Sequence, residues 1–393
     1  MTIHLAEATI DEQDMLALAD WITGFPRLTK GKLTVEFENK WADWIGTQYA
    51  TFVNSGSSAN LLMLSTLMEA GDLEPGDAVI VPALSWATDL APVMQLGLIP
   101  ILCDCNLEDF SVDLDHFESI ITDGVVREKG NINVRLRPKA AILVSVLGLL
   151  PRMDRIVSIC KNNKVILLED CCESLGSAMP DGRKLGTFGA MSTFSTYFGH
   201  HISTIEGGMV CTNDGRYDKI MKSVRSHGWC RDWSEEDQKV HCERWDISEF
   251  DAFYTFFHAG YNLRSTDLQA FLGLRQLEKL NEVCMNRWRN FNWYNSYLVD
   301  EYRRPNDEAF TSNFAFPILS ERRDDIAKAL MAKDIECRPL ICGSMGKQPF
   351  YVKKYGEEEL PNAEIVRKYG MYLPNHHLLS EDDIKAVCEV ING

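Results

Sequence analysis

Between residues 50 and 212, short apolar segments alternate with segments of helical periodicity, and this alternation most constrains the fold. The apolar segments that we expect to form buried strands are 50–53, 78–82, 99–103, 140–146, 165–169, 191–196 and 209–212. Helices are expected between them at 58–69, 84–96 and 153–162. Strands that alternate with helices form a largely parallel sheet covered by helices. The sequence therefore predicts an α/β fold, in which ligands bind in the loops at the carboxyl ends of the strands.

The pattern changes after about residue 215. Expected helices at 217–226 and 266–281 flank the charged stretch 231–249, which is typical of an exposed excursion. From about residue 313 a smaller unit follows, with expected strands at 314–319 and 335–340 and expected helices at 324–333 and 382–391. A chain of 393 residues is long enough for two cores. We therefore expect a large domain over residues 1–290 and a smaller one over residues 291–393.

The charge balance and the cysteine pattern disfavour several classes of function. The chain has 40 Lys+Arg and 57 Asp+Glu, and the net charge of −17 disfavours binding to nucleic acid or to anionic membranes. No segment reaches the roughly 18 apolar residues of a membrane-spanning helix, and residues 1–7 lack the pattern of a signal peptide. We expect a cytoplasmic protein. The 12 cysteines include no C-x2-C pair, so we expect reduced thiols and no metal site.

Three loops that follow expected strands carry residues suited to a ligand. Residues 55–58, Ser-Gly-Ser-Ser, begin a helix whose free backbone N–H groups could bind phosphate, with a plain helix cap as the equal alternative. Trp86 could stack on a flat ring, although a core position is more common for tryptophan. Asp170 ends an apolar strand and suits pairing with a protonated ring nitrogen, with helix capping as the alternative. Glu173 adds a carboxylate three residues later.

The loop between the last two expected strands carries the most reactive residues. It holds the adjacent His200 and His201, followed by Glu206. Histidine can move protons near neutral pH, because its unperturbed pKa is about 6.5. Taken alone, an ordinary polar loop residue that satisfies backbone groups is the more common role for one or both histidines.

Taken in this order, the Ser-Gly-Ser-Ser turn, Trp86, Asp170 and the loop before Glu206-Gly-Gly resemble the DegT/DnrJ/EryC1/StrS family of nucleotide-sugar aminotransferases. The resemblance covers most of the chain and includes the motifs Gly260-Tyr-Asn262-Leu-Arg264, Cys337-Arg338-Pro and Tyr372-Leu-Pro-Asn375-His376. It implies the type I fold of the aminotransferases that depend on pyridoxal 5'-phosphate (PLP), with a large, mostly parallel sheet domain and a smaller C-terminal α+β domain. It also implies a homodimer whose active sites are built from both subunits.

The same resemblance implies roles for individual residues. Those that would hold the cofactor are Gly56, Ser57, Ser58 and Ser195 at its phosphate, Trp86 over its ring, Asp170 at the ring nitrogen, Glu173 near the phenolic oxygen, and Asn262 at the phosphate in the partner subunit. Those that would contact the substrate are His201, Arg264 and Arg338, with a structural role as the equal alternative for His201.

One position departs from the aminotransferase pattern. Where the family has a lysine, six residues before the glutamate of Glu-Gly-Gly, this chain has His200, and no lysine occurs between Lys184 and Lys219. This loop therefore offers no amine to bind the cofactor covalently. The same change is found in the 3-dehydratase branch of the family, which makes 3,6-dideoxysugars. Only Cys230 and Cys242 lie between residues 225 and 261, too few for a four-cysteine iron–sulfur site, so the resemblance is to the branch without a cluster.

The resemblance thus implies a 3-dehydratase that uses pyridoxamine 5'-phosphate, the amino form of PLP, with His200 as the catalytic residue. The implied substrate is a nucleotide-linked 4-keto-6-deoxyhexose, with a GDP-linked one favoured. Glutamate is the expected amino donor, and ammonia is released. Two alternatives stay open: an aminotransferase with no lysine or with one from elsewhere, and a noncatalytic PLP-binding regulator.

Overall fold

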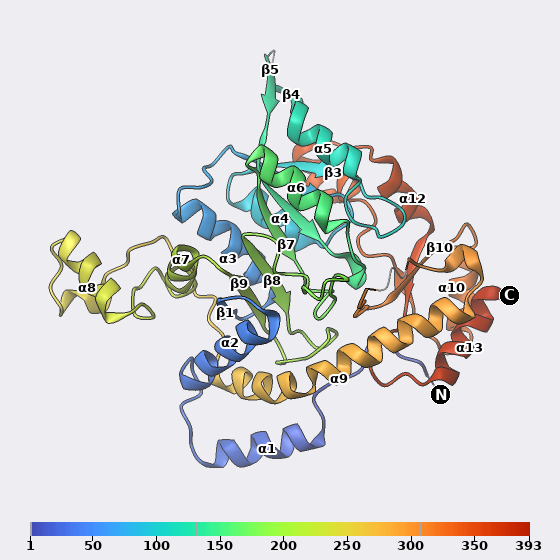
Figure 1. The fold of residues 1–393 in the computed structure, drawn as a ribbon, viewed down its shortest axis with the longest axis horizontal. Coiled ribbons are helices and arrows are strands. Elements are labelled where there is room, and N and C mark those ends of the chain that lie inside the picture. The colour runs from blue at the N-terminus through green and yellow to red at the C-terminus, as the bar shows by residue number, and fades with distance from the viewer. Residues whose placement is uncertain (1, 130–131, 306–308) are drawn as a thin grey trace.

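The computed structural model describes residues 2–129, 132–305 and 309–393 and is built around a seven-stranded sheet (Figure 1). The strands are β1 (Tyr49–Val53), β2 (Ala78–Pro82), β3 (Ile99–Cys103), β6 (Pro138–Val144), β7 (Ile166–Asp170), β8 (Met191–Ser195) and β9 (Gly208–Thr212). Their order in the sheet is β1-β9-β8-β7-β6-β2-β3. The strands from β3 to β8 run parallel, whereas β9 is antiparallel to both β8 and β1. The predicted mixed but mostly parallel sheet is confirmed.

Successive strand residues point to opposite faces of the sheet and enter two separate cores. Val79 and Val81 belong to the core beneath α3 (Gly56–Glu69), α4 (Ala87–Gln95) and α7 (Gly215–Arg225). Ala78 and Ile80 belong to the other core. The helices over that second face are α2 (Lys32–Ile45), α5 (Leu114–Asp123) and α6 (Met153–Asn163). Helices on both faces explain why the strands read as continuous apolar runs.

A smaller three-stranded sheet lies near the C-terminus, with the order β10-β12-β11. Its strands are β10 (Phe316–Leu319), β11 (Arg338–Pro339) and β12 (Gly370–Leu373), and its helices are α10 (Arg323–Met331), α11 (Pro349–Tyr355), α12 (Pro361–Tyr369) and α13 (Glu381–Asn392). The strand expected at 335–340 shrinks to two residues, and one of them is a proline, which has no N–H to donate to a longer ladder.

The helix expected to end at residue 281 continues instead to Tyr297 as α9 (Asp267–Tyr297). It contains one early glycine and no proline, so no helix breaker interrupts it. It crosses the boundary expected after residue 290 and packs against both α2 and α13 (Figure 1). At the other end of the chain, Ile3 pairs with Ile335 beside the smaller sheet. The division into residues 1–290 and 291–393 stays a prediction.

The remaining elements are short or lie outside the two sheets. They are α1 (Glu12–Thr23), the hairpin of β4 (Val125–Lys129) and β5 (Ile132–Leu136), α8 (Glu235–Arg244), and the short 3-10 helices η1 (Val146–Gly148), η2 (Asp251–Tyr254), η3 (Asp300–Tyr302) and η4 (Met345–Lys347). Helix α8 projects from the body at the left of Figure 1 and has no buried residue, as expected for the charged stretch 231–249.

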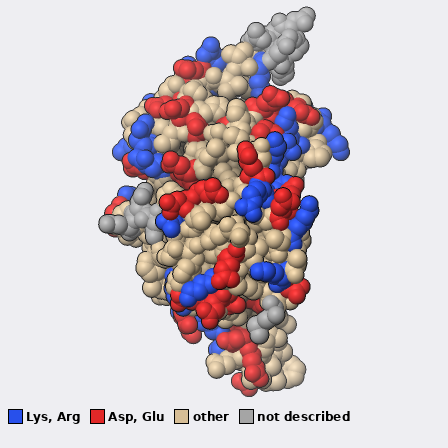
Figure 2. All heavy atoms as spheres, turned by 90° about the vertical axis from the view of Figure 1, so that its right-hand side faces the viewer, with Lys and Arg blue, Asp and Glu red and all other residues tan. Residues whose placement is uncertain are grey.

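The surface carries both signs of charge. Figure 2 shows basic and acidic side chains interspersed over one face of the molecule. Within the described ranges, no helix is both long and apolar enough to cross a membrane.

Candidate active site

A cavity of about 650 Å³ opens where β6, β7 and β8 end, between the large sheet and the smaller one. The predicted site residues that line it are Gly56, Ser57, Trp86, Asp170, Glu173, Ser195, His200 and Arg338. They lie at the ends of β7 and β8, in the segments that directly follow β1, β2, β7 and β8, and in β11. The parallel strands bring these loops to one edge of the sheet, as the sequence predicted.

The start of α3 forms one wall of the cavity. Ser55 caps the helix, because its Oγ accepts a hydrogen bond from the Ser58 backbone N–H at 3.0 Å. A Cβ atom on Gly56 would lie 2.7 Å from the Ser195 Cβ, so glycine is needed for this close approach. The Ser58 hydroxyl is bonded to Ser55 and does not line the cavity. The first N–H groups of the helix have no helical partner and are suited to an anion.

Asp170 and Trp86 form two further parts of the wall. The Asp170 carboxylate is buried and accepts hydrogen bonds from the Asn60 side-chain amide at 2.7 Å and from the Cys172 backbone N–H at 2.8 Å. Trp86 precedes α4 and remains 60% exposed, so it is not a core residue. Its position beside the cavity favours stacking on a ligand ring.

His200 lies on the loop between β8 and β9, with its ring centre 5.3 Å from that of Phe314. Its Nδ1 atom is buried and has no hydrogen-bond partner within the part of the chain that the structure describes. Burial lowers the pKa of the imidazole to about 4, with opposing effects from Asp170 and Arg287. The ring is therefore neutral at pH 7 and can accept a proton.

Glu173 has the opposite shift. Burial raises the pKa of its carboxyl group to about 7, although the Leu147 backbone N–H donates a hydrogen bond to Oε2 at 2.8 Å. Near neutral pH, a large fraction of Glu173 is therefore protonated and able to donate a hydrogen bond. The cavity thus contains a neutral base and a weak acid.

Residues 9–392 match the DegT/DnrJ/EryC1/StrS aminotransferase family. The chain belongs to this family. Two relatives are GDP-4-keto-6-deoxy-D-mannose 3-dehydratases. The protein from Yersinia pseudotuberculosis is 32% identical, and the match covers 98% of this chain and 97% of the relative. The protein from Escherichia coli O55:H7 is 30% identical, and the match covers 98% of each chain. A crystal structure of GDP-4-keto-6-deoxymannose-3-dehydratase with a trapped PLP-glutamate geminal diamine has a TM-score of 0.87 at 29% identity, covering 99% of both chains. The predicted family and type I fold are confirmed.

The cavity fits the PLP cofactor of this family. The start of α3 beside Ser195 can hold a phosphate, Trp86 offers a flat face, and Asp170 offers a carboxylate to a ring nitrogen. His200 lines the same cavity and places its imidazole ring beside these groups. No lysine is among the described residues that line the cavity, so the departure from the aminotransferase pattern extends to the whole site.

His201 does not share the surroundings of its neighbour. It is completely buried, and its Nε2 lies 2.9 Å from the Ser312 carbonyl oxygen, away from the residues that line the cavity. Burial lowers its pKa well below the usual value, so the neutral ring donates this hydrogen bond. The expected contact between His201 and the substrate is therefore not supported, and the structural alternative is favoured.

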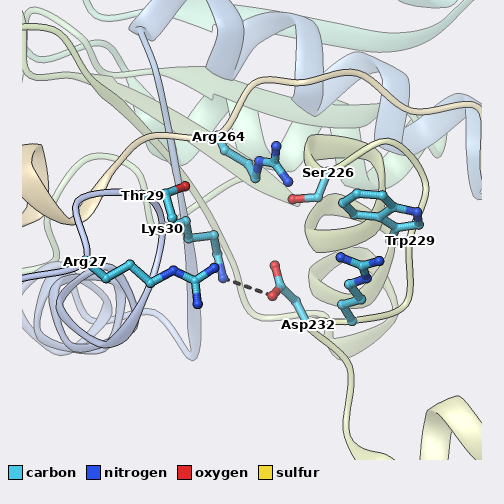
Figure 3. A pocket seen from close by; sticks show the side chains of 8 residues that line it. Arg27, Thr29, Lys30, Ser226, Trp229, Asp232 and Arg264 are labelled. Atoms are coloured by element: carbon cyan, nitrogen blue, oxygen red, sulfur yellow. Dashed lines mark hydrogen bonds and ion pairs between the residues drawn. The ribbon is translucent and has the colours of Figure 1, made fainter. Parts of the chain in front are cut away.

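Arg264 lines a second, smaller cavity of about 170 Å³ (Figure 3). The other residues around it are Arg27, Thr29, Lys30, Ser226, Trp229, Arg231 and Asp232. Asn262 is exposed and pairs with Ser226 beside this cavity. Neither Asn262 nor Arg264 therefore lines the cavity of His200 in the same subunit, and any contact of theirs with that cofactor or substrate requires a second subunit.

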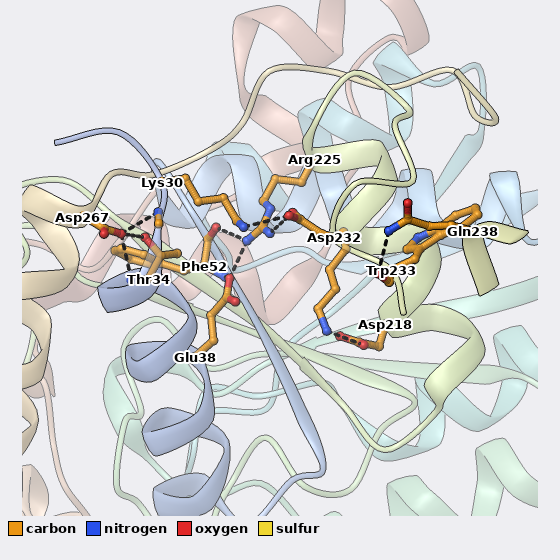
Figure 4. Close-up of polar contacts among 12 residues, drawn as sticks. Lys30, Thr34, Glu38, Phe52, Asp218, Arg225, Asp232, Trp233, Gln238 and Asp267 are labelled. Atoms are coloured by element: carbon orange, nitrogen blue, oxygen red, sulfur yellow. Dashed lines mark hydrogen bonds and ion pairs between the residues drawn. The ribbon is translucent and has the colours of Figure 1, made fainter. Parts of the chain in front are cut away.

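A buried ion network supports the wall of the second cavity (Figure 4). Arg225 is fully buried, pairs with Glu38 and with Asp232, and donates to the Phe52 carbonyl oxygen at 2.9 Å. Lys30 bonds to Asp232 at 2.9 Å. The network connects α2, β1 and the loop after α7, and so fixes the position of Asp232 between the basic groups.

Sequence reasoning assigned no role to several residues that line the main cavity, although some of them stand in the motifs quoted above. They are Ser55, Asn60, Ser85, Thr88, Asp89, Val144, Val146, Cys172, Tyr197, Gly199, Glu206, Phe314, Pro339, Ile341 and Tyr372. For two of them a signal was available. Asn60 lies four residues after Gly56, and therefore on the same face of α3, and Asp89 lies one helical turn after Trp86. Tyr372 begins a motif that carries the family resemblance, but the motif assigns it no role. Phe314 carried no signal, because only the packing of the smaller sheet brings it to the site.

Proposed function

We propose that this protein is a pyridoxamine-phosphate-dependent 3-dehydratase, which removes the C3 hydroxyl group of a nucleotide-linked 4-keto-6-deoxyhexose to give a 4-keto-3,6-dideoxysugar. One observation carries the proposal: the cavity has the groups for PLP, and its described lining residues include His200 but no lysine. Without a lysine the cofactor is held noncovalently, and the amine that it delivers is free to leave as ammonia.

In this role the cofactor, when bound, would supply an amine for the 4-keto carbon of the sugar. Its pyridine ring would withdraw electrons from the linkage formed with that carbon. The backbone at Gly56 and Ser57, together with Ser195, would hold the phosphate. Trp86 would stack on the ring, and Asp170 would keep its nitrogen protonated. Glu173, when protonated, would donate a hydrogen bond to the phenolic oxygen.

His200 would act as base and then as acid. The neutral imidazole accepts a proton in the cavity and, once protonated, gives it to the C3 hydroxyl group, which leaves as water. Arg338 lines the opposite wall and carries the positive charge that an anionic part of the substrate or of the amino donor requires. Glutamate is the proposed amino donor, because a solved relative holds PLP and glutamate together.

The nucleotide is proposed to be GDP, as in the names of the two relatives. In a homodimer, Asn262 and Arg264 would complete the partner subunit's active site. The cavity of Arg264 supports this assignment, because it also contains Arg27, Lys30 and Arg231 against a single carboxylate, Asp232, which suits a diphosphate. We propose that the reaction takes place in the cytoplasm.

The test is to incubate the purified protein with PLP and glutamate, and then with GDP- or CDP-linked 4-keto-6-deoxyhexose. We expect the absorption of the amino form of the cofactor to appear with glutamate, followed by ammonia release and loss of one water from the GDP-linked sugar. An amine retained on the sugar would indicate an aminotransferase. Cofactor binding without any conversion of sugar would indicate a noncatalytic protein.

A further inference from the structure

The wall of the active-site cavity contains a second buried aspartate that none of the roles above uses. Asp89 lies in the first turn of α4, three residues after Trp86, and is 1% exposed. Its Oδ2 accepts a hydrogen bond from the Trp86 backbone N–H at 3.0 Å. Acidic residues commonly make this contact at a helix start. By this contact alone, Asp89 would be an ordinary capping residue.

Asp89 also shares a hydrogen-bond partner with Asp170, the last residue of β7. The Asn60 side-chain amide donates to Asp89 Oδ1 at 3.1 Å and to Asp170 Oδ2 at 2.7 Å, so a single nitrogen atom bridges the two carboxyl groups. The Thr193 hydroxyl donates to Asn60 Oδ1 at 2.6 Å, which fixes the amide in this orientation.

Two carboxyl groups bridged by one nitrogen atom cannot both be ionised without a large cost, because like charges repel strongly in a buried site. The charged groups that act most on Asp89 are Asp170 and Glu173, and both are acidic. Burial and the charge of Asp170 raise the pKa of Asp89 well above its usual range. Asp170 accepts hydrogen bonds at 2.7 and 2.8 Å, whereas those to Asp89 are 3.0 and 3.1 Å, so Asp170 is the better site for the negative charge.

We propose that Asp89 is a positioning residue whose protonated carboxyl group donates a hydrogen bond to Asp170 and thereby holds Asp170 ionised and oriented toward the cofactor's ring nitrogen. The pair holds one proton, and Asn60 fixes its geometry from the side. The part that concerns the ring nitrogen rests on the proposed function, whereas the shared proton does not. The other titratable groups around the pair are Cys172, Glu173, His200 and Cys342.

The first test uses cofactor-free protein and Asp89→Asn, whose carboxamide donates to Asp170 and accepts from Trp86 as the protonated acid does. The wild-type protein keeps a proton on Asp89 when folded and releases it on unfolding, so its stability should fall as the pH rises above the unfolded-state pKa of an aspartate, about 4. Relative to Asp89→Asn, its unfolding constant should therefore rise with pH above about 4, by at most about tenfold per pH unit, until the folded protein also loses the proton. Urea unfolding at each pH measures this ratio. A ratio that does not change with pH would overturn the proposal.

The second test measures the dissociation constant of pyridoxamine phosphate. Asp89→Ala should weaken binding about tenfold, as the loss of an orienting partner does, whereas Asp89→Asn should stay within about threefold of the wild type. Asp383→Ala is the matched control, because Asp383 makes the same capping contact in α13, to the Ser380 backbone N–H at 2.9 Å, far from the cavity. Unchanged binding in Asp89→Ala would reduce Asp89 to a capping residue and overturn its positioning role.

The two tests separate this inference from the proposed function. If the unfolding constants of the wild type and Asp89→Asn diverge as the pH rises but no nucleotide sugar is dehydrated, the shared proton is supported and the dehydratase proposal fails. The pH comparison uses the isosteric variant only, so it decides the question of the proton even if Asp89→Ala does not fold.

Discussion

His200 and His201 are neighbours in the chain but have different surroundings. The ring of His200 lines a cavity, whereas that of His201 is completely buried, and its Nε2 is bonded to the Ser312 carbonyl. Access to the cavity separates a group that can exchange protons with a ligand from one that holds two segments together. The contrast leads to predictions for individual side chains.

Replacing His200 by Asn should leave folding and cofactor affinity unchanged within about threefold, because the proposed cofactor contacts belong to other residues. The dehydration rate should fall by about 10²–10⁴-fold, because the base is lost. His200→Lys should instead allow a covalent link to PLP that borohydride fixes, which mass spectrometry of the peptides would detect. As a contrast, His201→Leu should lower the free energy of unfolding by about 1–3 kcal/mol, because the buried Ser312 carbonyl loses its donor. Full activity in His200→Asn would show that another group is the base.

The pKa values of His200 and Glu173 predict a bell-shaped dependence of kcat/KM on pH. His200 must be neutral, so activity should be lost as the pH falls through about 4. Glu173 must be protonated, so activity should also be lost as the pH rises through about 7. Glu173→Gln cannot ionise and still offers a donor, and it should therefore remove the loss on the alkaline side. If the alkaline limb persists unchanged in this variant, Glu173 is not the group that titrates there.

At the scale of secondary-structure elements, the start of α3 depends both on the order of strands in the sheet and on the geometry of the helix. Strand β9 lies between β1 and β8, and the chain after β1 turns back so that Gly56 lies against Ser195 at the end of β8. Any side chain on Gly56 would enter this contact. Because of this tight packing, we expect the start of α3, which is proposed to hold the phosphate, to tolerate few substitutions.

Gly56→Ala should weaken PLP binding by at least about tenfold, because the new Cβ would lie 2.7 Å from the Ser195 Cβ and 3.1 Å from the Cys172 Sγ. Gly215→Ala is the matched control. Gly215 also begins a helix, α7, but a Cβ there would lie 3.4 Å from the nearest atom, the Tyr49 hydroxyl. Titration of each variant with PLP, followed by absorption, gives the two affinities. Equal affinities would mean that the α3 start does not hold the phosphate.

At the scale of the whole molecule, each subunit holds two groups of proposed site residues in two cavities. His200, Asp170 and Trp86 line one, and Arg264 lines the other with Asn262 beside it. The arrangement is the one expected if the second group serves a neighbouring subunit. It makes the proposal of shared active sites testable without a structure of the dimer.

Mixing Asn262→Ala chains with His200→Asn chains should restore activity that neither variant has alone. A heterodimer would have one site with both residues intact and one with neither. Activity should therefore reach about a quarter of the wild-type level in an equal mixture with random pairing, because half of the dimers carry one intact site. Size-exclusion chromatography with light scattering checks that the variants are dimers. If no mixture exceeds the separate variants, the sites are not shared in this way.

The sequence by itself determined the strand and helix pattern of the large sheet, the family, and the positions of Asp170, Trp86 and His200 at strand ends. These features are local, because burial on both faces gives continuous apolar runs and parallel strands end at one edge. The length of α9 was underestimated, because the buried stripe of its second half includes the polar residues Arg287 and Asn290 and does not read as apolar in the sequence.

Only the tertiary structure decided which of the two histidines faces the cavity, where Arg264 lies, and that Asn60 bridges Asp89 and Asp170. Each of these facts depends on contacts between segments far apart in the chain, such as Asn60 with Asp170 or His201 with Ser312. Such contacts follow from the order of strands in the sheet and from the packing of the smaller sheet against it, and no periodicity in the sequence encodes them.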